Sequence, residues 1–167
     1  MSDETAAFIH LLQRFSERVA ARDAEGFALL FTPDAYYDDV FYGRHQGRAA
    51  IAAMLEKFLR DGSDFEWEMH EPVCAHGIGY AHWDFSFTSH KPGLEGKRVL
   101  MVGASRFRME PHGLIMAYDE WCYQASALLG IGTPLAALEK SLLSQDAKFR
   151  NQADARRHRL NQSQPAT

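Results

Sequence analysis

The chain of 167 residues and 18.9 kDa has the length of one ordinary domain with a tail. Its hydrophobic fraction of 46% and charged fraction of 24% are typical of a soluble globular protein and exclude wholesale disorder. The formal net charge of -4 argues against a dedicated nucleic-acid-binding domain, which would be basic. The start is acidic and no apolar run approaches the ~18 residues that cross a bilayer. We therefore expect a cytoplasmic protein with no membrane partner.

The first part of the chain is predicted to be mainly helical. Apolar residues at three- and four-residue steps indicate an amphipathic helix capped by Ser2 or Asp3, and Asp23 caps a short second helix. The predicted elements are a helix at Glu4 to Arg22, a helix at Ala24 to Phe31, a strand at Ala35 to Gly43 and a helix at Ala49 to Arg60.

The middle of the chain is predicted to form long antiparallel strands. Apolar and polar residues alternate in residues 65–77, 79–89, 98–109 and 113–123, and Gly- or Pro-containing turns join these segments. Helices followed by consecutive strands predict an α+β fold with the helices on one face of a curved sheet.

The C-terminal part is predicted to lie outside this sheet. Thr133 and Pro134 supply a cap and a first-turn proline for one more helix. We divide the chain into an α+β domain at residues 1–130, a C-terminal helix at 131–150 and a polar, flexible tail at 151–167. The cluster of arginines at 156, 157 and 159 would suit a contact with an anionic partner, but we expect a solvated tail instead.

The order and spacing of four short motifs resemble the nuclear-transport-factor-2-like superfamily, and more narrowly its SnoaL-like proteins. The motifs are Leu30-Phe31-Thr32-Pro33-Asp34-Ala35, Gly47-Arg48-Ala49-Ala50-Ile51, Ser105-Arg106-Phe107-Arg108 and Gly113-Leu114-Ile115. The resemblance implies a cone-shaped antiparallel sheet wrapped around three N-terminal helices, with an apolar cavity open at one end. It also implies a homodimer, for which we expect the outer sheet face. The same fold carries isomerases, dehydratases, epoxide hydrolases, cyclases and binding proteins, so it leaves the function open.

An alignment with ketosteroid isomerase places the catalytic base of that enzyme on Asp39. It places the tyrosine of the oxyanion hole on Phe15 and the second donor near Ser105. Phe15 cannot donate a hydrogen bond, and losing one such donor costs on the order of 100- to 1000-fold in rate. Steroid isomerase activity is therefore not expected.

The resemblance to limonene epoxide hydrolase implies a second arrangement. Its two catalytic carboxylates fall on Asp84 and Glu120, its arginine on His82, and its water-holding tyrosine and asparagine on Tyr37 and Asp39. The change from arginine to histidine is a departure, because histidine loses its charge near neutral pH. In a SnoaL-like cyclase, Glu120 or Asp119 would be the acidic residue.

Residues two apart on a strand have side chains on the same face of the sheet. Whether these side chains point into the cavity or towards solvent therefore decides between the alternatives. We expect Asp39, His82, Asp84 and Glu120 to meet as catalytic groups in the cavity. Alternatively, His82 and Asp84 face water while the neighbouring aromatic residues face the core. The predicted substrate-binding residues are Phe15, Tyr37, Trp67, Ser105, Phe107 and Tyr118, although Trp67 and Phe107 are also natural wall or core residues.

No metal site and no cofactor are expected. His70, His76 and His82 are spaced by six residues, which no short ligand motif uses, and His45 reads as a solvated turn residue. The sequence thus predicts a cofactor-free acid/base enzyme (hydrolase, isomerase, dehydratase or cyclase) acting on a small apolar molecule. A non-catalytic binding or dimerisation module of the same fold is the alternative.

Overall fold

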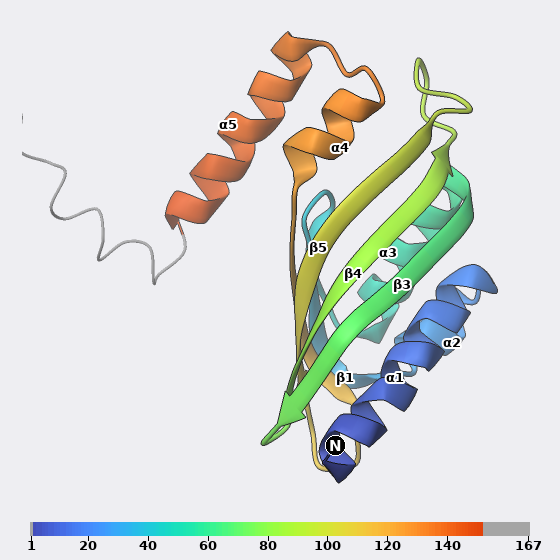
Figure 1. Ribbon diagram of the computed structural model, residues 1–167, viewed down its shortest axis with the longest axis vertical. Coiled ribbons are helices and arrows are strands. Elements are labelled where there is room, and N and C mark those ends of the chain that lie inside the picture. Colours follow the sequence, from blue (N-terminus) through green and yellow to red (C-terminus); the bar gives the residue numbers. More distant parts are fainter. Residues whose placement is uncertain (1, 152–167) are drawn as a thin grey trace, which may run out of the picture.

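The computed structural model describes residues 2–151 and contains a curved six-stranded sheet with three helices on one side of it (Figure 1). The helices are α1 (Asp3–Ala20), α2 (Ala24–Ala28), α3 (Arg48–Asp61), α4 (Gln124–Gly130) and α5 (Leu135–Asn151). The strands are β1 (Phe31–Asp39), β2 (Gly43–Gln46), β3 (Gly62–Ala75), β4 (Ile78–Ser89), β5 (Arg98–Met109) and β6 (Ile115–Cys122). Apart from Asn151, the predicted tail lies outside the described residues.

The first two helices form where the sequence places their caps. The Ser2 hydroxyl accepts a hydrogen bond from the Thr5 amide at 3.2 Å, and an Asp23 carboxylate oxygen accepts one from the Gly26 amide at 2.8 Å. The apolar stripe of α1 is buried against the sheet through Phe8, Leu11, Leu12, Phe15 and Val19. The predicted helical segments at the N-terminus are thus present with small shifts of their ends.

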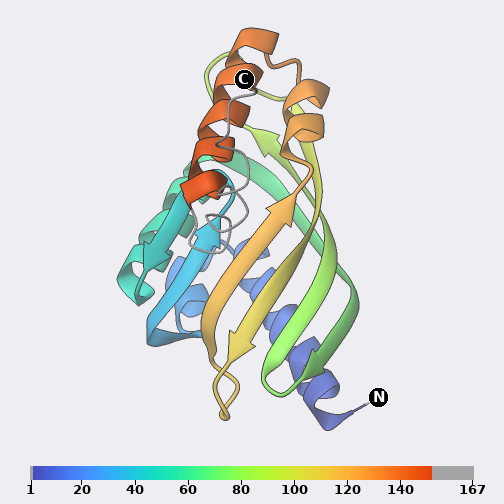
Figure 2. The same ribbon diagram turned by 90° about the vertical axis from the view of Figure 1, so that its left-hand side faces the viewer.

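The strand order in the sheet is β2-β1-β6-β5-β4-β3. All neighbours are antiparallel except β1 and β6, which pair in parallel, so the last strand lies beside the first (Figure 2). The α+β fold with a curved open sheet is confirmed.

Two elements differ from the sequence prediction. The segment Ala35 to Gly43 is not one strand, because the chain turns at residues 40–42 and returns as the short strand β2. Helix α4 was not predicted, although its Ala127 and Ile131 are buried beside Val99 and Met101. A helix this short shows too little periodicity to be recognised before its packing partners are known.

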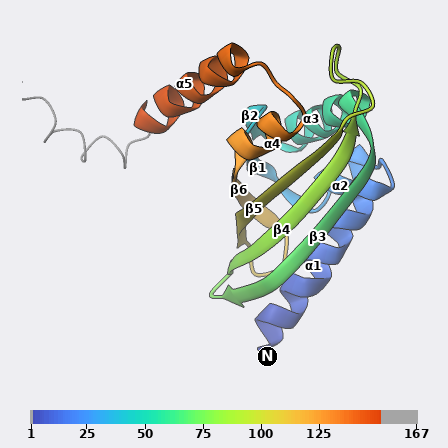
Figure 3. The same ribbon diagram turned by 45° about the horizontal axis from the view of Figure 1, so that its top comes forward.

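The buried core lies between the helices and the inner face of the sheet. One cluster packs α1, α2 and α3 onto the sheet and includes Phe15, Phe31, Phe107 and Tyr118. A second cluster, which includes Trp83, Phe85 and Met101, lies under α4. α4 and α5 lie together at one end of the sheet (Figure 3).

The opposite face of the sheet is exposed and carries several apolar side chains. Tyr80, Leu100 and Trp121 are between 45% and 59% exposed. The predicted homodimer through this face stays a prediction, as does the cytoplasmic location. None of the described helices is both long and apolar enough to span a membrane.

The close approach of Trp83 to Gly103 generates a stability prediction. A Cβ atom on Gly103 would lie 2.5 Å from Cζ2 of Trp83 and would also collide with the Trp121 carbonyl oxygen. Gly103→Ala should therefore lower the free energy of unfolding by about 1–3 kcal/mol, measured by urea denaturation. Gly130→Ala is the matched control, since nothing lies within 4 Å of a Cβ there. Equal stabilities for Gly103→Ala and the parent chain would contradict this packing.

Candidate active site

A cavity lies on the inner face of the sheet, between β1, β4 and β6 and helix α3. It has a volume of about 40 Å³, which is room for a single water molecule. Its walls are mainly aromatic and aliphatic, and two carboxyl groups, those of Asp39 and Glu120, supply its acidic chemistry. The lining residues are Phe27, Tyr37, Asp39, Phe41, Tyr42, Met54, Leu55, Phe58, Trp67, Trp83, Phe85, Met101, Glu120 and Cys122.

Asp39 is the last residue of β1, where the chain turns towards β2. One carboxylate oxygen, Oδ1, accepts hydrogen bonds from the amides of Phe41 at 2.7 Å and Tyr42 at 2.6 Å. An aspartate that binds backbone amides two and three residues ahead stabilises a tight turn. The same two bonds also fix the direction in which the Asp39 carboxyl group points.

Glu120 lies on β6, beside the end of β1. The parallel register pairs Asp38 with Asp119, so the next residues along the two strands, Asp39 and Glu120, share the inner face. The Glu120 carboxyl accepts a hydrogen bond from the Val40 amide at 3.0 Å through Oε1 and one from the Tyr118 hydroxyl at 2.9 Å through Oε2. Backbone pairing thus brings two carboxyl groups to one point in the cavity.

A chain of hydrogen bonds runs from Trp83 to Glu120 behind the cavity wall. The Trp83 indole donates to the Ser105 hydroxyl at 2.7 Å, Ser105 donates to Tyr118 at 2.8 Å, and Tyr118 donates to Glu120. The direction of the first bond is fixed, because an indole N–H only donates. Buried Ser105 and Tyr118 therefore both present protons towards the carboxyl group.

Burial raises the pKa of both carboxyl groups. For Glu120 the charge of Asp39 raises the pKa further, and the pKa lies well above its ordinary value of 4.5. For Asp39 the amides of Tyr42 and Phe41, the charge of His45 and the hydrogen bond from Glu120 oppose the rise in pKa. Two close carboxyl groups in an apolar cavity do not both ionise. Both carboxyl groups therefore hold a proton more readily than a carboxyl group in water does.

The other titratable side chains of the cavity remain neutral. Burial, together with the charges of Glu120 and Asp39, raises the pKa of the Cys122 thiol to about 12. Cys122 therefore does not supply a thiolate nucleophile. Burial also raises the pKa of Tyr42, whose hydroxyl donates a 2.6 Å hydrogen bond to Asp61.

His82 and Asp84 do not lie in the cavity. On β4 the inward positions are taken by Ala81, Trp83 and Phe85, which are 2–3% exposed, so the residues between them face outwards. His82 is exposed and the Asp84 side chain is 46% exposed. The expectation that both residues meet Asp39 and Glu120 is wrong. The bulky aromatic side chains take the buried face because their burial is more favourable than that of a charged pair.

The predicted substrate-binding residues fall into three groups. Tyr37 and Trp67 line the cavity, and Ser105 and Tyr118 lie behind its wall in the hydrogen-bond chain. Phe15 and Phe107 are fully buried, with ring centroids 5.6 Å apart, and neither lines the cavity. These two residues are core residues, and the expectation that they contact substrate is wrong.

Sequence reasoning missed His45 at this site. His45 lies opposite Tyr37 on β2, its Nε2 atom is buried without a hydrogen-bond partner, and its charge influences the pKa of Asp39. It was interpreted as a solvated turn residue because β2 itself was not predicted. Phe41 and Phe58, two aromatic residues of the cavity wall, were also missed. Their role is visible only from their packing in the folded protein.

Comparison with family models places this chain in a known family. Residues 12–118 match the model of the SnoaL-like domain. The chain belongs to the SnoaL-like family. A search of curated proteins finds no match to this SnoaL-like protein.

Solved structures share the fold of this SnoaL-like protein at low sequence identity. A hypothetical protein from Catenulispora acidiphila with a ketosteroid isomerase-like fold, in complex with trimethylamine, is 14% identical with a TM-score of 0.67, covering 74% of this chain and 93% of its own. An LEH-like epoxide hydrolase from M. tuberculosis is 18% identical with a TM-score of 0.64, covering 81% and 96%. TsrD from Streptomyces laurentii is 15% identical with a TM-score of 0.67, covering 80% and 99%. These likenesses concern the fold.

The raised pKa of Glu120 predicts a particular pH dependence of stability. Above pH 4.5 the unfolded chain releases the Glu120 proton while the folded protein retains it, so folding becomes less favourable as pH rises. The slope is at most about 1.4 kcal/mol per pH unit for one retained proton. Glu120→Gln, which carries no proton to lose, should therefore gain stability relative to the parent chain as the pH rises above 4.5.

Urea denaturation at each pH measures this difference. Glu56→Gln, which removes an exposed carboxylate of α3, is the control, and its profile should run parallel to that of the parent. A Glu120→Gln profile that also runs parallel to the parent would show that Glu120 is ionised in the folded protein.

Proposed function

We propose that this SnoaL-like protein is an enzyme that performs cofactor-independent general acid/base catalysis in the cavity. Asp39 acts as the base and Glu120 as the acid, and the substrate is a small apolar molecule with one oxygen or nitrogen acceptor. The observation that carries the proposal is the placement of the Asp39 and Glu120 carboxyl groups together inside an aromatic cavity.

The hydrogen bonds around each carboxyl group fit its role. Asp39 accepts hydrogen bonds from two backbone amides, which orient its carboxylate and stabilise its charge. When Glu120 gives its proton to a substrate atom, the Val40 amide and the Tyr118 hydroxyl already point at the resulting carboxylate. Donors that are oriented before the reaction lower the cost of forming charge in a water-poor site.

A proton transfer through this pair is balanced. Asp39 takes a proton from a carbon atom or from an attacking water molecule, and Glu120 gives its proton to the oxygen or nitrogen atom that gains the electron pair. The two residues exchange protonation states during one turnover. The reaction classes that such an exchange serves are isomerisation, elimination and hydration.

The wall residues define the substrate class. Trp67, Trp83 and Phe85 favour an apolar or planar molecule, and the side chains that line the cavity include no Lys, Arg or His. A strongly anionic substrate would therefore lack a counter-charge. Since the cavity holds about 40 Å³, substrate binding requires the partly buried rings of Phe41 and Phe58 to move aside.

Two finer alternatives lose support from this geometry. The triad of an epoxide hydrolase would need Asp84 and a cationic residue at position 82 inside the cavity, but β4 directs Trp83 and Phe85 inwards there. The oxyanion hole of a ketosteroid isomerase would need a donor at Phe15, which is a core residue. The acid/base pair of Asp39 and Glu120 is independent of both arrangements.

The elimination of 5-nitrobenzisoxazole tests the proposal, because a desolvated carboxylate base opens this ring to a coloured phenolate. The parent protein should accelerate the reaction, and Asp39→Asn should reduce kcat/KM by about 100-fold or more. Glu120→Gln should shift the pH profile, since the proton shared with Asp39 is lost. Asp38→Asn is the matched control, because Asp38 is the neighbouring carboxylate on the outward side of β1, paired with Arg44 at 2.7 Å.

A loss of activity in Asp38→Asn equal to that in Asp39→Asn would contradict a site-specific base. The alternative function is a non-catalytic binding module, which is favoured by the small volume of the cavity. Unaltered binding of the benzisoxazole, with equal affinity for the parent and Asp39→Asn and no product, would support that alternative.

A further inference from the structure

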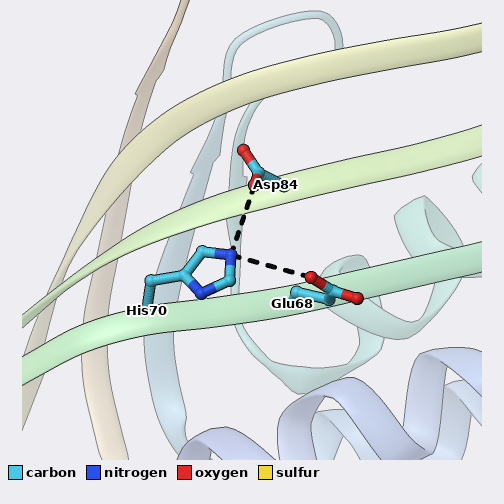
Figure 4. A group of neighbouring side chains, drawn as sticks. All are labelled: Glu68, His70 and Asp84. Atoms are coloured by element: carbon cyan, nitrogen blue, oxygen red, sulfur yellow. Dashed lines mark ion pairs between the residues drawn. The ribbon is translucent and has the colours of Figure 1, made fainter.

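A cluster of metal-ligating side chains lies on the outer face of the sheet, across β3 and β4 from the cavity. Glu68 and His70 are two residues apart on β3 and therefore share this face, and Asp84 is paired with Glu68 on β4. Figure 4 shows the His70 ring directed between the two carboxylates. One ligand atom from each of the three residues lies within 4.8 Å of the other two.

The distances are close to those of a shared metal ion. His70 Nε2 lies 3.2 Å from Asp84 Oδ2 and 3.8 Å from Glu68 Oε2. Two ligand atoms bound to one tetrahedral zinc ion at 2.0–2.2 Å are separated by about 3.3–3.5 Å. Small rotations of the exposed Glu68 and Asp84 side chains, which are 74% and 46% exposed, bring all three atoms to this separation.

The His70 ring supplies a second, independent observation. Its Nε2 atom has no solvent contact and no hydrogen-bond partner, although it lies between two carboxylates. The His70 side chain is 40% exposed, and the two carboxylate oxygens lie within ion-pair distance of Nε2 without forming a hydrogen bond to it. A metal ion between these groups would bind the lone pair of Nε2. Among the ion pairs of residues 2–151, neither Glu68 nor Asp84 is paired with Lys or Arg. Arg98 of β5 forms an ion pair with Glu66, at 3.1 Å.

We propose that Glu68, His70 and Asp84 form a binding site for a divalent transition-metal ion, with zinc as the best-fitting ion. One imidazole nitrogen and two carboxylate oxygens suit Zn²⁺, and a fourth position remains for water. His82 lies opposite His70 on β4, with ring centroids 6.1 Å apart.

Such an ion would join the edge strand β3 to β4. The register of this pair shifts on both sides of the site, between Ser63 and Glu66 and between His70 and Val73. A metal bridge on the outer face would therefore add a link across the regular section of this edge, opposite the aromatic contacts that join the two strands on the inner face. Because a ligand that binds only the folded chain stabilises it, the ion should raise Tm.

Isothermal titration of the untagged chain with ZnCl₂ tests the site. We expect one equivalent of zinc to bind, and His70→Ala and Asp84→Asn each to weaken binding by at least about 10-fold. At a zinc concentration about 100-fold above the dissociation constant, Tm of the parent should rise by about 5–10 °C. Both variants should lose this rise while keeping the circular dichroism spectrum of the parent.

Two control variants each remove one carboxylate or one histidine outside the proposed metal site. Glu66→Gln changes the next outward carboxylate of β3, which is already paired with Arg98, and His112→Gln changes an exposed histidine in the β5–β6 turn. Both should bind zinc as the parent does. Binding of Co²⁺ should also produce the intense visible absorption of a tetrahedral site, and His70→Ala should abolish it.

Either of two results would overturn the proposal. One is the absence of zinc binding and of any Tm change, in which case His70 is a protonated partner of the two carboxylates. The other is equal zinc binding by the parent and His70→Ala, which would assign the ion to other histidines. Neither result bears on Asp39 and Glu120, which lie on the opposite face of the sheet.

Discussion

The parallel pairing of β1 with β6 is the constraint on which the candidate active site depends. Every other pair in the sheet is antiparallel, and this single exception returns the last strand to the side of the first. As a result Asp39 and Glu120, 81 positions apart along the chain, share one face at the same level of the sheet. The two carboxyl groups therefore line the same apolar cavity.

The packing around the pair maintains its unusual protonation. Tyr118 is fully buried, and its ring stacks on Phe15 at 5.5 Å and lies 4.2 Å from the ring of Tyr37. These contacts hold the Tyr118 hydroxyl between Ser105 and Glu120. Phe15, at the position where an isomerase would present a donor, is instead a fully buried core residue that packs on Tyr118.

The two faces of the sheet carry different kinds of polar chemistry. On the inner face Asp39, Ser105, Tyr118 and Glu120 are buried and hydrogen-bonded to fixed neighbours. On the outer face Glu68, His70, His82 and Asp84 lie together on adjacent strands, and the carboxylate side chains of Glu68 and Asp84 are 74% and 46% exposed. A general acid needs the first environment, and exchangeable ion binding suits the second.

The amino-acid sequence by itself determined the elements and the family. Amphipathic spacing predicted the long helices, alternation predicted the long strands, and short motifs in a fixed order indicated the SnoaL-like fold. These properties follow from neighbours along the chain, where periods of 3.6 and 2 residues decide which side chains share a face.

Tertiary structure decided which face was buried. Alternation showed that His82 and Asp84 share one side of β4 and Trp83 and Phe85 the other, but both assignments satisfy the same pattern. The choice depends on the aromatic residues of α3 and β3, such as Phe58 and Trp67, which pack against Phe85 at 5.6 Å and 4.8 Å. In the same way, His45 comes close to Asp39 only because the chain turns at residues 40–42 and returns as strand β2. Contacts between segments distant along the chain have no local signature, and they carry the energy that selects one face over the other.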